Sequence, residues 1–156
     1  MLKVGETAPQ FKLYDTDLNL VFLKDFAGKK VVLAFYPGAF TAVCQKEMCT
    51  LNRAMSKFEK LNAQVIGISV DGPFANRAFK IQNEISFPIL CDFNREVVNM
   101  YDVAEENFYA IDGYTAARRS VFILDREGKI AYMWLSKNAG QEPDYEEIER
   151  ELEKIK

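Results

Sequence analysis

The chain has 156 residues, of which 49% are hydrophobic and 28% are charged, as is typical of a globular protein large enough to bury a core. Its 20 basic and 23 acidic residues give a net charge of −3, so no basic excess is available for binding nucleic acid or an anionic membrane. No apolar stretch approaches the roughly 18 residues of a membrane span. We expect a single domain over residues 1–156, and the N-terminal residues lack the composition of a signal peptide, which favours a cytoplasmic location.

An arm, a hairpin and a buried strand are expected in the N-terminal part. Residues 1–10 are predicted to form an ordered arm. Residues 11–14 alternate between apolar and polar side chains, and residues 20–23 are their expected partner across a turn. Residues 31–35 form a continuous apolar run with β-branched side chains, which is typical of a central strand covered on both faces.

A long helix is expected over residues 41–61. Its apolar side chains recur at spacings that place them in one stripe facing the core. The stripe consists of Cys44, Met48, Leu51, Met55 and Phe58. At roughly 100° per residue, Cys49 points about 140° away from Cys44. The two sulfurs therefore do not face each other along this helix.

Strands and helices alternate in the next part of the chain. A strand is predicted over residues 64–70, followed by a helix with proline at its favoured first turn, Pro73. The apolar stripe expected on that helix consists of Phe74, Ala78, Ile81 and Ile85. After it come a short strand, a short helix and an irregular stretch expected to be a surface loop, over residues 87–91, 94–101 and 104–114.

The C-terminal part is predicted to add a hairpin and a helix. Strands over residues 120–124 and 130–135 flank a turn, and a helix follows over residues 143–156. The apolar face of that helix consists of Tyr145, Ile148, Leu152 and Ile155. Alternating strands and helices imply parallel crossovers, and the hairpins add antiparallel strands. We therefore expect an α/β fold with a central mixed sheet flanked by helices and an N-terminal β-hairpin.

The cysteine and histidine counts narrow the chemistry. The chain has three cysteines and no histidine. The absence of histidine removes Cys–His nucleophile pairs, Ser-His-Asp triads and mixed Cys/His zinc sites. An odd number of cysteines in a cytosolic protein indicates redox or catalytic use more than a disulfide framework. We expect neither a metal nor a cofactor.

One stretch, residues 36–49, joins a buried strand to a helix through a Pro-Gly loop and places Cys44 in or near the first helical turn. Backbone N–H groups without intrahelical partners cluster at such an N-terminus, and the helix dipole adds a positive end. Both favour the thiolate, which is the nucleophilic form of cysteine. With no histidine present, arginine, lysine or backbone N–H groups must supply any further activating charge.

These residues resemble a known family. Pro37, Thr41 and Cys44 fit the Pro-x-x-x-Thr-x-x-Cys signature of peroxiredoxins, and residues 4–11, 87–92 and 119–125 resemble other segments of that family. The position of Cys49 is similar to the bacterioferritin-comigratory-protein-like branch. The Pro-Gly-Ala-Phe-Thr loop also occurs in one-cysteine, alkyl hydroperoxide reductase-like relatives.

The resemblance implies a thioredoxin-like fold and a thiol peroxidase that reduces hydrogen peroxide and organic hydroperoxides. Cys44 would be the peroxidatic cysteine, Thr41 would contact the peroxide and the thiolate, and Pro37 would shield them. Arg119 would hold both thiolate and peroxide, with Arg118 as the alternative. Glu47 would help to fix the arginine. The resemblance also implies a peroxide substrate, a thioredoxin-like thiol reductant and a homodimer.

The sequence is compatible with several ways of reducing the oxidised Cys44 sulfur. By resemblance, Cys49 would resolve the Cys44 sulfenic acid as an intramolecular disulfide. Residues five apart in a helix have Cα atoms roughly 8–9 Å apart, beyond the ~7 Å limit of a disulfide, so the first helical turns would have to unwind. Cys49 could instead be a bystander in a one-cysteine peroxidase, and Cys91 could be structural or an alternative resolving thiol. Two other classes of protein compete with the peroxidase. One is a redox sensor or chaperone, and the other is a dithiol oxidoreductase.

Overall fold

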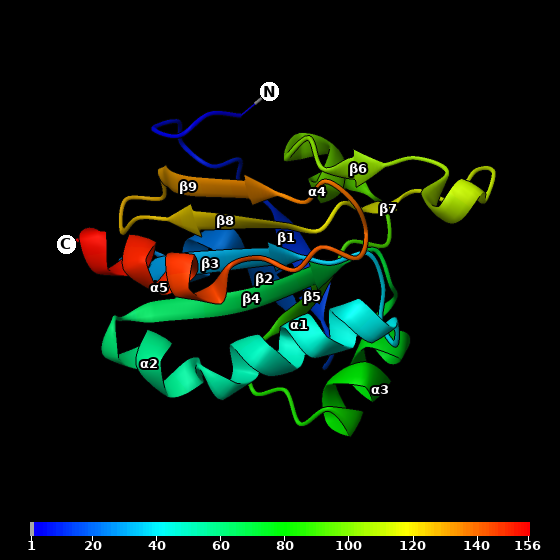
Figure 1. Cartoon of the computed structure of the whole chain (residues 1–156), viewed down its shortest axis with the longest axis horizontal. Coiled ribbons are helices and arrows are strands. Elements are labelled where there is room, and N and C mark those ends of the chain that lie inside the picture. The colour runs from blue at the N-terminus through cyan, green and yellow to red at the C-terminus, as the bar shows by residue number, and fades with distance from the viewer. Residues whose placement is uncertain (1) are drawn as a thin grey trace.

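The computed structural model describes residues 2–156, and Met1 lies outside the described residues. Seven strands form one mixed sheet in the order β2-β1-β5-β4-β3-β8-β9 (Figure 1). These strands are β1 (Lys12–Asp15), β2 (Leu20–Phe22), β3 (Lys30–Phe35), β4 (Ala63–Ser69), β5 (Ile89–Cys91), β8 (Ser120–Leu124) and β9 (Ile130–Leu135). A separate two-stranded pair consists of β6 (Ala104–Glu105) and β7 (Ala116–Ala117).

The helices are α1 (Ala42–Arg53), α2 (Met55–Lys60), α3 (Pro73–Gln82), α4 (Glu96–Met100) and α5 (Tyr145–Lys154), with 3-10 turns η1 (Leu23–Phe26) and η2 (Phe108–Ala110). Strands β3, β4 and β5 run parallel, while β8, β9 and the β1–β2 hairpin are antiparallel to their neighbours. The expected α/β fold, with its mixed sheet and N-terminal hairpin, is therefore confirmed.

Strand β3 lies inside the sheet, between β4 and β8, and all six of its residues are buried. Its side chains alternate between two cores, as a strand covered on both faces requires. Val32 and Ala34 pack with α1, α2, α3 and α5, while Leu33 and Phe35 pack with α4 and the N-terminal hairpin. Figure 1 shows α1, α2, α3 and α5 on one side of the sheet. The sheet thus forms a rigid layer between two hydrophobic cores.

The long helix expected over residues 41–61 is two helices, because α1 ends at Arg53 and α2 begins at Met55. Ala54 lies between them with φ −90° and ψ 3°, outside regular helical geometry. The expected stripe is otherwise present: Cys44, Met48, Leu51 and Phe58 are buried, and Met55 is half-buried against the same core.

The stripe expected on α3 is wrong, apart from Ile85, which is buried just beyond the end of the helix. Phe74 and Ile81 are 76% and 65% exposed, whereas Asn76 and Phe79 face the core. The amide of Asn76 takes part in a buried polar cluster with Ser69 and accepts a hydrogen bond from the hydroxyl of Tyr36. A pattern of apolar residues cannot reveal a helix face whose buried position is an asparagine with satisfied hydrogen bonds.

The remaining segments follow the expectations with shifted ends. Within the expected arm, Gly5 and Ala8 donate backbone hydrogen bonds to the β8–β9 hairpin, so its described part is ordered. The terminal helix begins at Tyr145 instead of residue 143, because Asp144 caps it and accepts from the N–H groups of Glu146 and Glu147. The short strand and helix are present as β5 and α4, and the stretch 104–114 holds β6 and η2.

Candidate active site

The loop that follows β3 ends in a helix N-cap. Thr41 occupies that position with an extended backbone, and its hydroxyl donates to the carbonyl of Gly38 at 2.9 Å. The N–H of Ala39 donates to Oδ2 of Asp71 at 2.8 Å. Phe40 has a left-handed φ of 64°, and its ring packs edge-on against Phe79. The loop is therefore held by one hydrogen bond of its own and by two contacts with residues 71–79.

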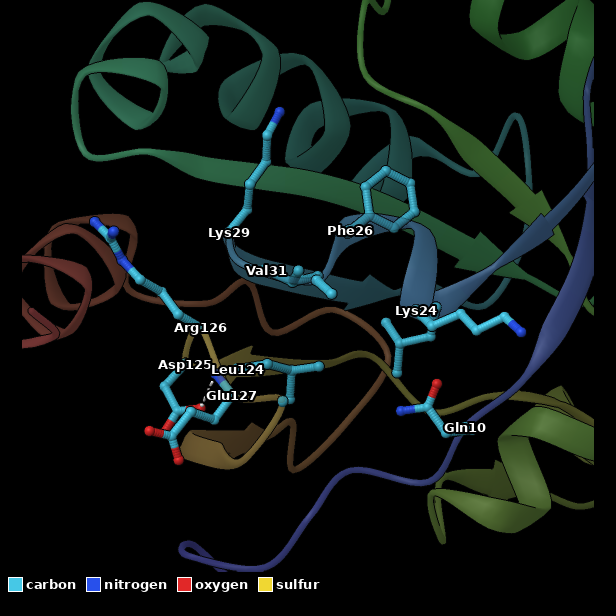
Figure 2. Close-up of a pocket in the computed structure, with 12 residues that line it drawn as sticks. Gln10, Lys24, Phe26, Lys29, Val31, Leu124, Asp125, Arg126 and Glu127 are labelled. Atoms are coloured by element: carbon cyan, nitrogen blue, oxygen red, sulfur yellow. Dashed lines mark hydrogen bonds between the residues drawn. The ribbon is translucent and has the colours of Figure 1, made fainter.

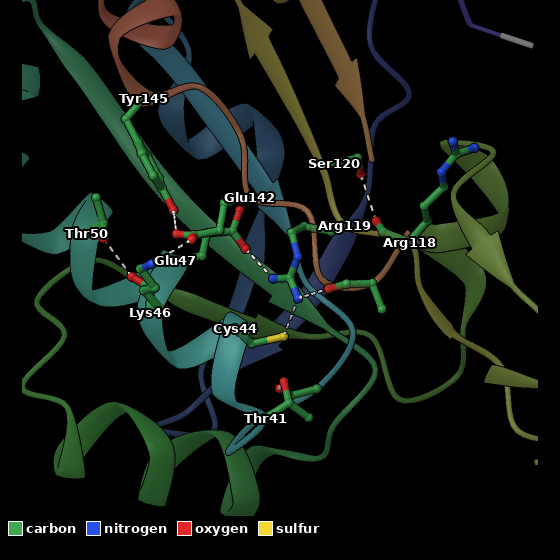
Figure 3. A network of polar contacts seen from close by, with 12 residues as sticks. Thr41, Cys44, Lys46, Glu47, Thr50, Arg118, Arg119, Ser120, Glu142 and Tyr145 are labelled. Carbon is green, nitrogen blue, oxygen red and sulfur yellow. Dashed lines mark hydrogen bonds and ion pairs between the residues drawn. The ribbon is translucent and has the colours of Figure 1, made fainter. Parts of the chain in front are cut away.

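Cys44 is the third residue of α1 and is fully buried. The N–H of Gln45 makes the bond to Thr41 O that opens the helix, so the N–H groups of residues 42–44 precede the helical hydrogen-bond ladder. The Cys44 Sγ accepts a hydrogen bond from Nη2 of Arg119 at 3.2 Å (Figure 3). The sulfur thus lies between a helix N-terminus and a guanidinium, two groups that favour a thiolate.

Arg119 precedes β8, and the register places its neighbour Ser120 opposite Phe35 at the end of β3. Its Nη1 donates to Oε1 of Glu47 at 2.7 Å, and its Nη2 also donates to the carbonyl of Ala139 at 3.0 Å. The guanidinium therefore bridges α1, β8 and the segment before α5 (Figure 3). The planar fork of arginine holds its donors on separate nitrogens at fixed positions, whereas the donors of lysine all lie on one nitrogen.

In each of the two charged groups, burial and the attraction of its partner shift the pKa in opposite directions. Burial raises the pKa of Glu47 to about 7, against the opposing attraction of Arg119. Burial also opposes the charge of Arg119, but the attraction of Glu47 and Cys44 outweighs it and raises the arginine pKa. Glu47 Oε2 and Arg119 Nε are buried without hydrogen-bond partners. One guanidinium thus serves two acids, a carboxyl and a thiol.

A second carboxyl group, that of Glu142, lies next to this network. Glu142, in the segment before α5, forms an ion pair with Lys46 at 3.2 Å and accepts a hydrogen bond from the Tyr145 hydroxyl at 2.6 Å. Burial opposes its ionisation, but these two partners lower the pKa of Glu142 overall. The segment that supplies the Ala139 carbonyl is therefore tied to α1 by a charged contact as well (Figure 3).

A small cavity of about 90 Å³ adjoins the arginine. Pro37 and Thr41 line it together with Arg119, and the other lining residues are Ala42, Val43, Phe108, Tyr109 and Ala139. A larger cavity, of about 340 Å³, lies at the opposite end of β3, between η1 and the β8–β9 turn (Figure 2). Leu23, Phe26, Val31 and Leu124 form its apolar part. It contains none of the residues around Cys44.

The other two cysteines lie apart from Cys44. Cys49 is half-buried and its thiol donates to Oδ1 of Asn83 at 3.6 Å, on the side of α1 that faces α3. Cys91 is buried at the end of β5, where its sulfur accepts from Nδ2 of Asn76 at 3.4 Å. Burial raises the pKa of the Cys91 thiol, in spite of the hydrogen bond from Asn76. All three cysteines are free thiols.

The structure brings together most of the residues singled out from the sequence. Cys44, Glu47 and Arg119 are in direct contact, and Pro37 and Thr41 share the small cavity with Arg119. The adjacent arginine, Arg118, instead donates to the carbonyl of Ser136 and does not contact the sulfur.

Three contributors were missed from the sequence. They are the carbonyl of Ala139, the carboxylate of Asp71 and the Phe108-Tyr109 wall of the cavity. A backbone carbonyl has no side-chain signature, and the other two depend on how distant segments pack. Within residues 2–156, no cluster of three or more histidine, cysteine or acidic side chains is placed to hold a metal, and no helix is long and apolar enough to cross a membrane.

Comparison with solved structures shows which fold the protein has. The structure superposes on peroxidoxin BcpB of Mycobacterium tuberculosis with a TM-score of 0.89 at 24% identity, covering 100% of this chain and 99% of that one. It superposes on a peroxiredoxin-like protein of Aquifex aeolicus with a TM-score of 0.87 at 30% identity, covering 97% and 86% of the two chains. The fold is the thioredoxin-like fold of peroxiredoxins.

Comparison of the sequence with known families and relatives shows the family to which the chain belongs. Residues 4–133 match the model of the AhpC/TSA family. Over 133 residues the chain is 34% identical to peroxiredoxin Bcp of Escherichia coli, and the match covers 85% of each chain. It is 35% identical over 129 residues to a putative peroxiredoxin of Mycobacterium tuberculosis, covering 83% and 82%. The chain belongs to the AhpC/TSA family and is an enzyme of the peroxiredoxin class, the thiol peroxidases.

Proposed function

We propose that the protein reduces hydrogen peroxide and organic hydroperoxides with Cys44 as the peroxidatic cysteine. The thiolate sulfur attacks one peroxide oxygen, an S–O bond forms and the O–O bond breaks. The departing oxygen takes up a proton and leaves as water or an alcohol. Cys44 is thereby oxidised to a sulfenic acid, and the peroxide is reduced by two electrons.

The contact between Arg119 and Cys44 carries this proposal. Nη2 lies 3.2 Å from Sγ, both side chains are buried, and the guanidinium also lines the small cavity. A peroxide in that cavity would meet the same cation that contacts the Cys44 sulfur. Donors aimed at developing charge in a water-poor site lower a barrier by several kcal/mol.

Three further residues receive supporting roles. Thr41 would accept a hydrogen bond from the peroxide at its hydroxyl oxygen, because its O–H already donates to Gly38, and Pro37 would keep water from the thiolate. Glu47 would hold the guanidinium in place through its 2.7 Å contact, without touching the substrate. We assign no role to Arg118, because its guanidinium donates to Ser136 O.

We assign Cys49 as the resolving cysteine. Its sulfur would attack the sulfur of the Cys44 sulfenic acid, forming a disulfide as water leaves. Because the residues are five apart within α1, their Cα atoms are roughly 8–9 Å apart, and the first turns must unwind before a disulfide can close. A dithiol donor of the thioredoxin type would then reduce the disulfide and become oxidised itself, in the reducing environment of a cytoplasm.

The experiment is rapid mixing of the reduced protein with hydrogen peroxide, followed by mass spectrometry and by turnover with thioredoxin, glutaredoxin or a small thiol. We expect Cys44→Ser to abolish peroxide consumption. The wild type should form a Cys44–Cys49 disulfide and turn over with thioredoxin, while Cys49→Ser should accumulate the sulfenic acid. Cys91→Ser should behave as wild type. Consumption of peroxide by Cys44→Ser would overturn the assignment.

A one-cysteine mechanism is the second candidate, and the position of Cys49 favours it. Its thiol donates to Asn83 on the far side of α1 from the Arg119 contact. In that mechanism an external thiol would reduce the Cys44 sulfenic acid directly. A free Cys49 beside an oxidised Cys44 in the peroxide-treated wild type would select it. A sensor or chaperone role would instead appear as oxidation of Cys44 without turnover by any of the donors.

A homodimer is a further proposal taken from the resemblance. Phe40, on the loop before α1, is 47% exposed, so an apolar ring is available on the surface beside the site. Light scattering of the reduced and the peroxide-treated protein tests this state. A monomer under both conditions would exclude it.

A further inference from the structure

The turn between β6 and β7 has an unusual backbone. Asn107, Tyr109 and Ala110 have φ values of 52°, 53° and 60°, so three of four consecutive residues are left-handed although none is glycine. Such conformations are uncommon for residues with a side chain, and they persist only where the surrounding structure imposes them. They concentrate at functional sites, so the contacts of this turn indicate its role.

The base of the turn is firmly held. The N–H of Gly113 donates to Oδ1 of Asn107, and the N–H of Phe108 donates to the carbonyl of Tyr114, both at 2.9 Å. Phe108 is buried in the core beside α4. Arg95 adds a 2.9 Å hydrogen bond to the carbonyl of Thr115. These contacts impose the strained backbone and fix the position of the residue at the tip.

The residue at the tip is Tyr109, and core packing does not account for it. Tyr109 is 72% exposed. Its ring has one aromatic neighbour, Phe108, with 4.5 Å between the ring centroids. None of the hydrogen bonds among residues 2–156 involves its hydroxyl. The strained backbone therefore fixes an exposed aromatic residue, and the role of that residue is indicated by the part of the molecule that it faces.

Tyr109 faces the small cavity beside Arg119. Together with Phe108 it lines one side, while Pro37, Thr41 and Val43 belong to the active-site loop and α1 on the other. The cavity measures about 90 Å³. Each liquid water occupies about 30 Å³, and pockets for drug-sized ligands measure about 300–1,000 Å³. The space therefore suits a molecule of a few heavy atoms, whereas an aromatic molecule would extend out of it.

We infer that Tyr109 determines which peroxides reach Cys44: its ring closes the outer side of the cavity, admitting hydrogen peroxide and small alkyl hydroperoxides and obstructing bulky aryl hydroperoxides. This inference rests on the proposed function, since it names the substrate class of the same site. Tyr109 acts through the size of the cavity and takes no part in the displacement at sulfur.

The test compares hydrogen peroxide with cumene hydroperoxide as oxidants of Cys44, measured as second-order rate constants by rapid mixing. The main variant is Tyr109→Gly, because glycine adopts φ 53° without strain and so removes the ring without straining the backbone of the turn. We expect the rate constant for cumene hydroperoxide to rise about 10-fold, the lower end of the range that apolar pockets achieve in discriminating size. The constant for hydrogen peroxide should stay within about twofold of wild type.

Two control variants separate the ring from the backbone. Ala110→Gly gives the neighbouring left-handed position the same freedom but keeps the ring, so the ratio of the two rate constants should equal that of wild type. Tyr109→Phe keeps the ring and removes a hydroxyl without a hydrogen bond, so it too should match wild type.

The outcomes distinguish this inference from the proposed function. Wild-type protein whose Cys44 reacts with neither peroxide would refute the function itself. A normal reaction with an unchanged ratio in Tyr109→Gly would refute the inference alone. So would an equal loss of both rates in Tyr109→Gly, or the same change of ratio in Ala110→Gly, since the first indicates positioning and the second indicates backbone mobility.

Discussion

Arg119 and Glu47 form an ion pair with 2.7 Å between Nη1 and Oε1, and their side chains are 1% and 0% exposed. Charges buried this deeply are costly to leave unpaired, so removal of either partner is strongly destabilising. The other terminal nitrogen of the same guanidinium contacts Cys44. Stability and the proposed chemistry therefore depend on one side chain, and substitutions that separate its charge from its shape are informative.

Arg119→Lys should slow oxidation of Cys44 by hydrogen peroxide about 100-fold, the lower end of the effect of removing one donor from a preorganised site. Lysine keeps the charge, but its N–H donors all lie on one nitrogen, whereas Arg119 contacts Glu47 through Nη1 and both Cys44 and the Ala139 carbonyl through Nη2. The measurement is the second-order rate constant from rapid mixing.

The matched control for that substitution is Arg118→Lys. Its side chain donates to the carbonyl of Ser136 and has no contact with the sulfur, so the rate should remain within about twofold of wild type. Equal losses in both variants would contradict a specific role for Arg119.

The raised pKa of Glu47 predicts a dependence of folding stability on pH. Burial raises it from 4.5 to about 7 in the folded state, so the folded protein binds the proton more tightly than the unfolded chain. This contribution to stability is complete below about pH 4.5 and is lost as the pH rises through about 7. At 1.36 kcal/mol per pKa unit, the loss amounts to roughly 3 kcal/mol.

Glu47→Gln isolates this effect, because the amide oxygen can still accept from Arg119 but does not titrate. The free energy of unfolding in urea should be measured for both proteins between pH 4.5 and pH 8. We expect the wild type to lose stability relative to the variant as the pH rises across this range. Parallel curves would mean that Glu47 stays ionised throughout.

Asp71→Ala should reduce the rate of Cys44 oxidation about 10-fold. Its Oδ2 accepts 2.8 Å hydrogen bonds from Ala39 N and from the hydroxyl of Ser69, so the substitution frees the loop before α1. Hydrogen bonds to charged groups contribute about 1.5–3 kcal/mol, and 1.36 kcal/mol is a factor of ten in rate.

Asp71→Asn tests whether the bond or the charge matters. One oxygen of Asp71 receives both hydrogen bonds, and the amide oxygen of asparagine can take its place. The rate should return close to that of wild type. An unaffected rate in Asp71→Ala would show that the loop keeps its shape without this anchor.

Sequence reasoning succeeded where burial is apolar and where a motif fixes chemistry. The runs that became β3 and β4 are apolar because both faces are covered, and the spacing of Cys44, Met48 and Leu51 follows the buried face of α1. It failed on α3, where the buried side chain is the hydrogen-bonded Asn76. Hydrophobic periodicity detects burial only when the buried residues are apolar.

The contacts around the site that escaped prediction depend on tertiary geometry. The carbonyl of Ala139 reaches Arg119 through the backbone, and Tyr109 reaches the cavity through a left-handed turn. Neither feature leaves a pattern of side chains along the sequence. The sequence predicts only an irregular loop over residues 104–114. The role of its aromatic residues can be inferred only once the fold has placed them beside α1.

Gly67→Ala should lower the free energy of unfolding by about 1–3 kcal/mol, the usual cost of overpacking a core. Gly67 lies in β4 between the partners Ala34 and Ile89. A Cβ there would lie 3.3 Å from the ring of Phe87 and 3.4 Å from the sulfur of Met48, which is one turn beyond Cys44 on α1. Both neighbours are fully buried, so neither can move away without disturbing the core.

Urea unfolding checks this value, with Gly140→Ala as the control. A Cβ at Gly140 would meet only the side chain of Asn138, at 3.5 Å, which is ordinary contact. We expect that control to stay within about 0.5 kcal/mol of wild type, as surface substitutions usually do. If Gly67→Ala were as stable as Gly140→Ala, the side chains of Phe87 and Met48 would accommodate the added methyl group, and the predicted overpacking of the core would be wrong.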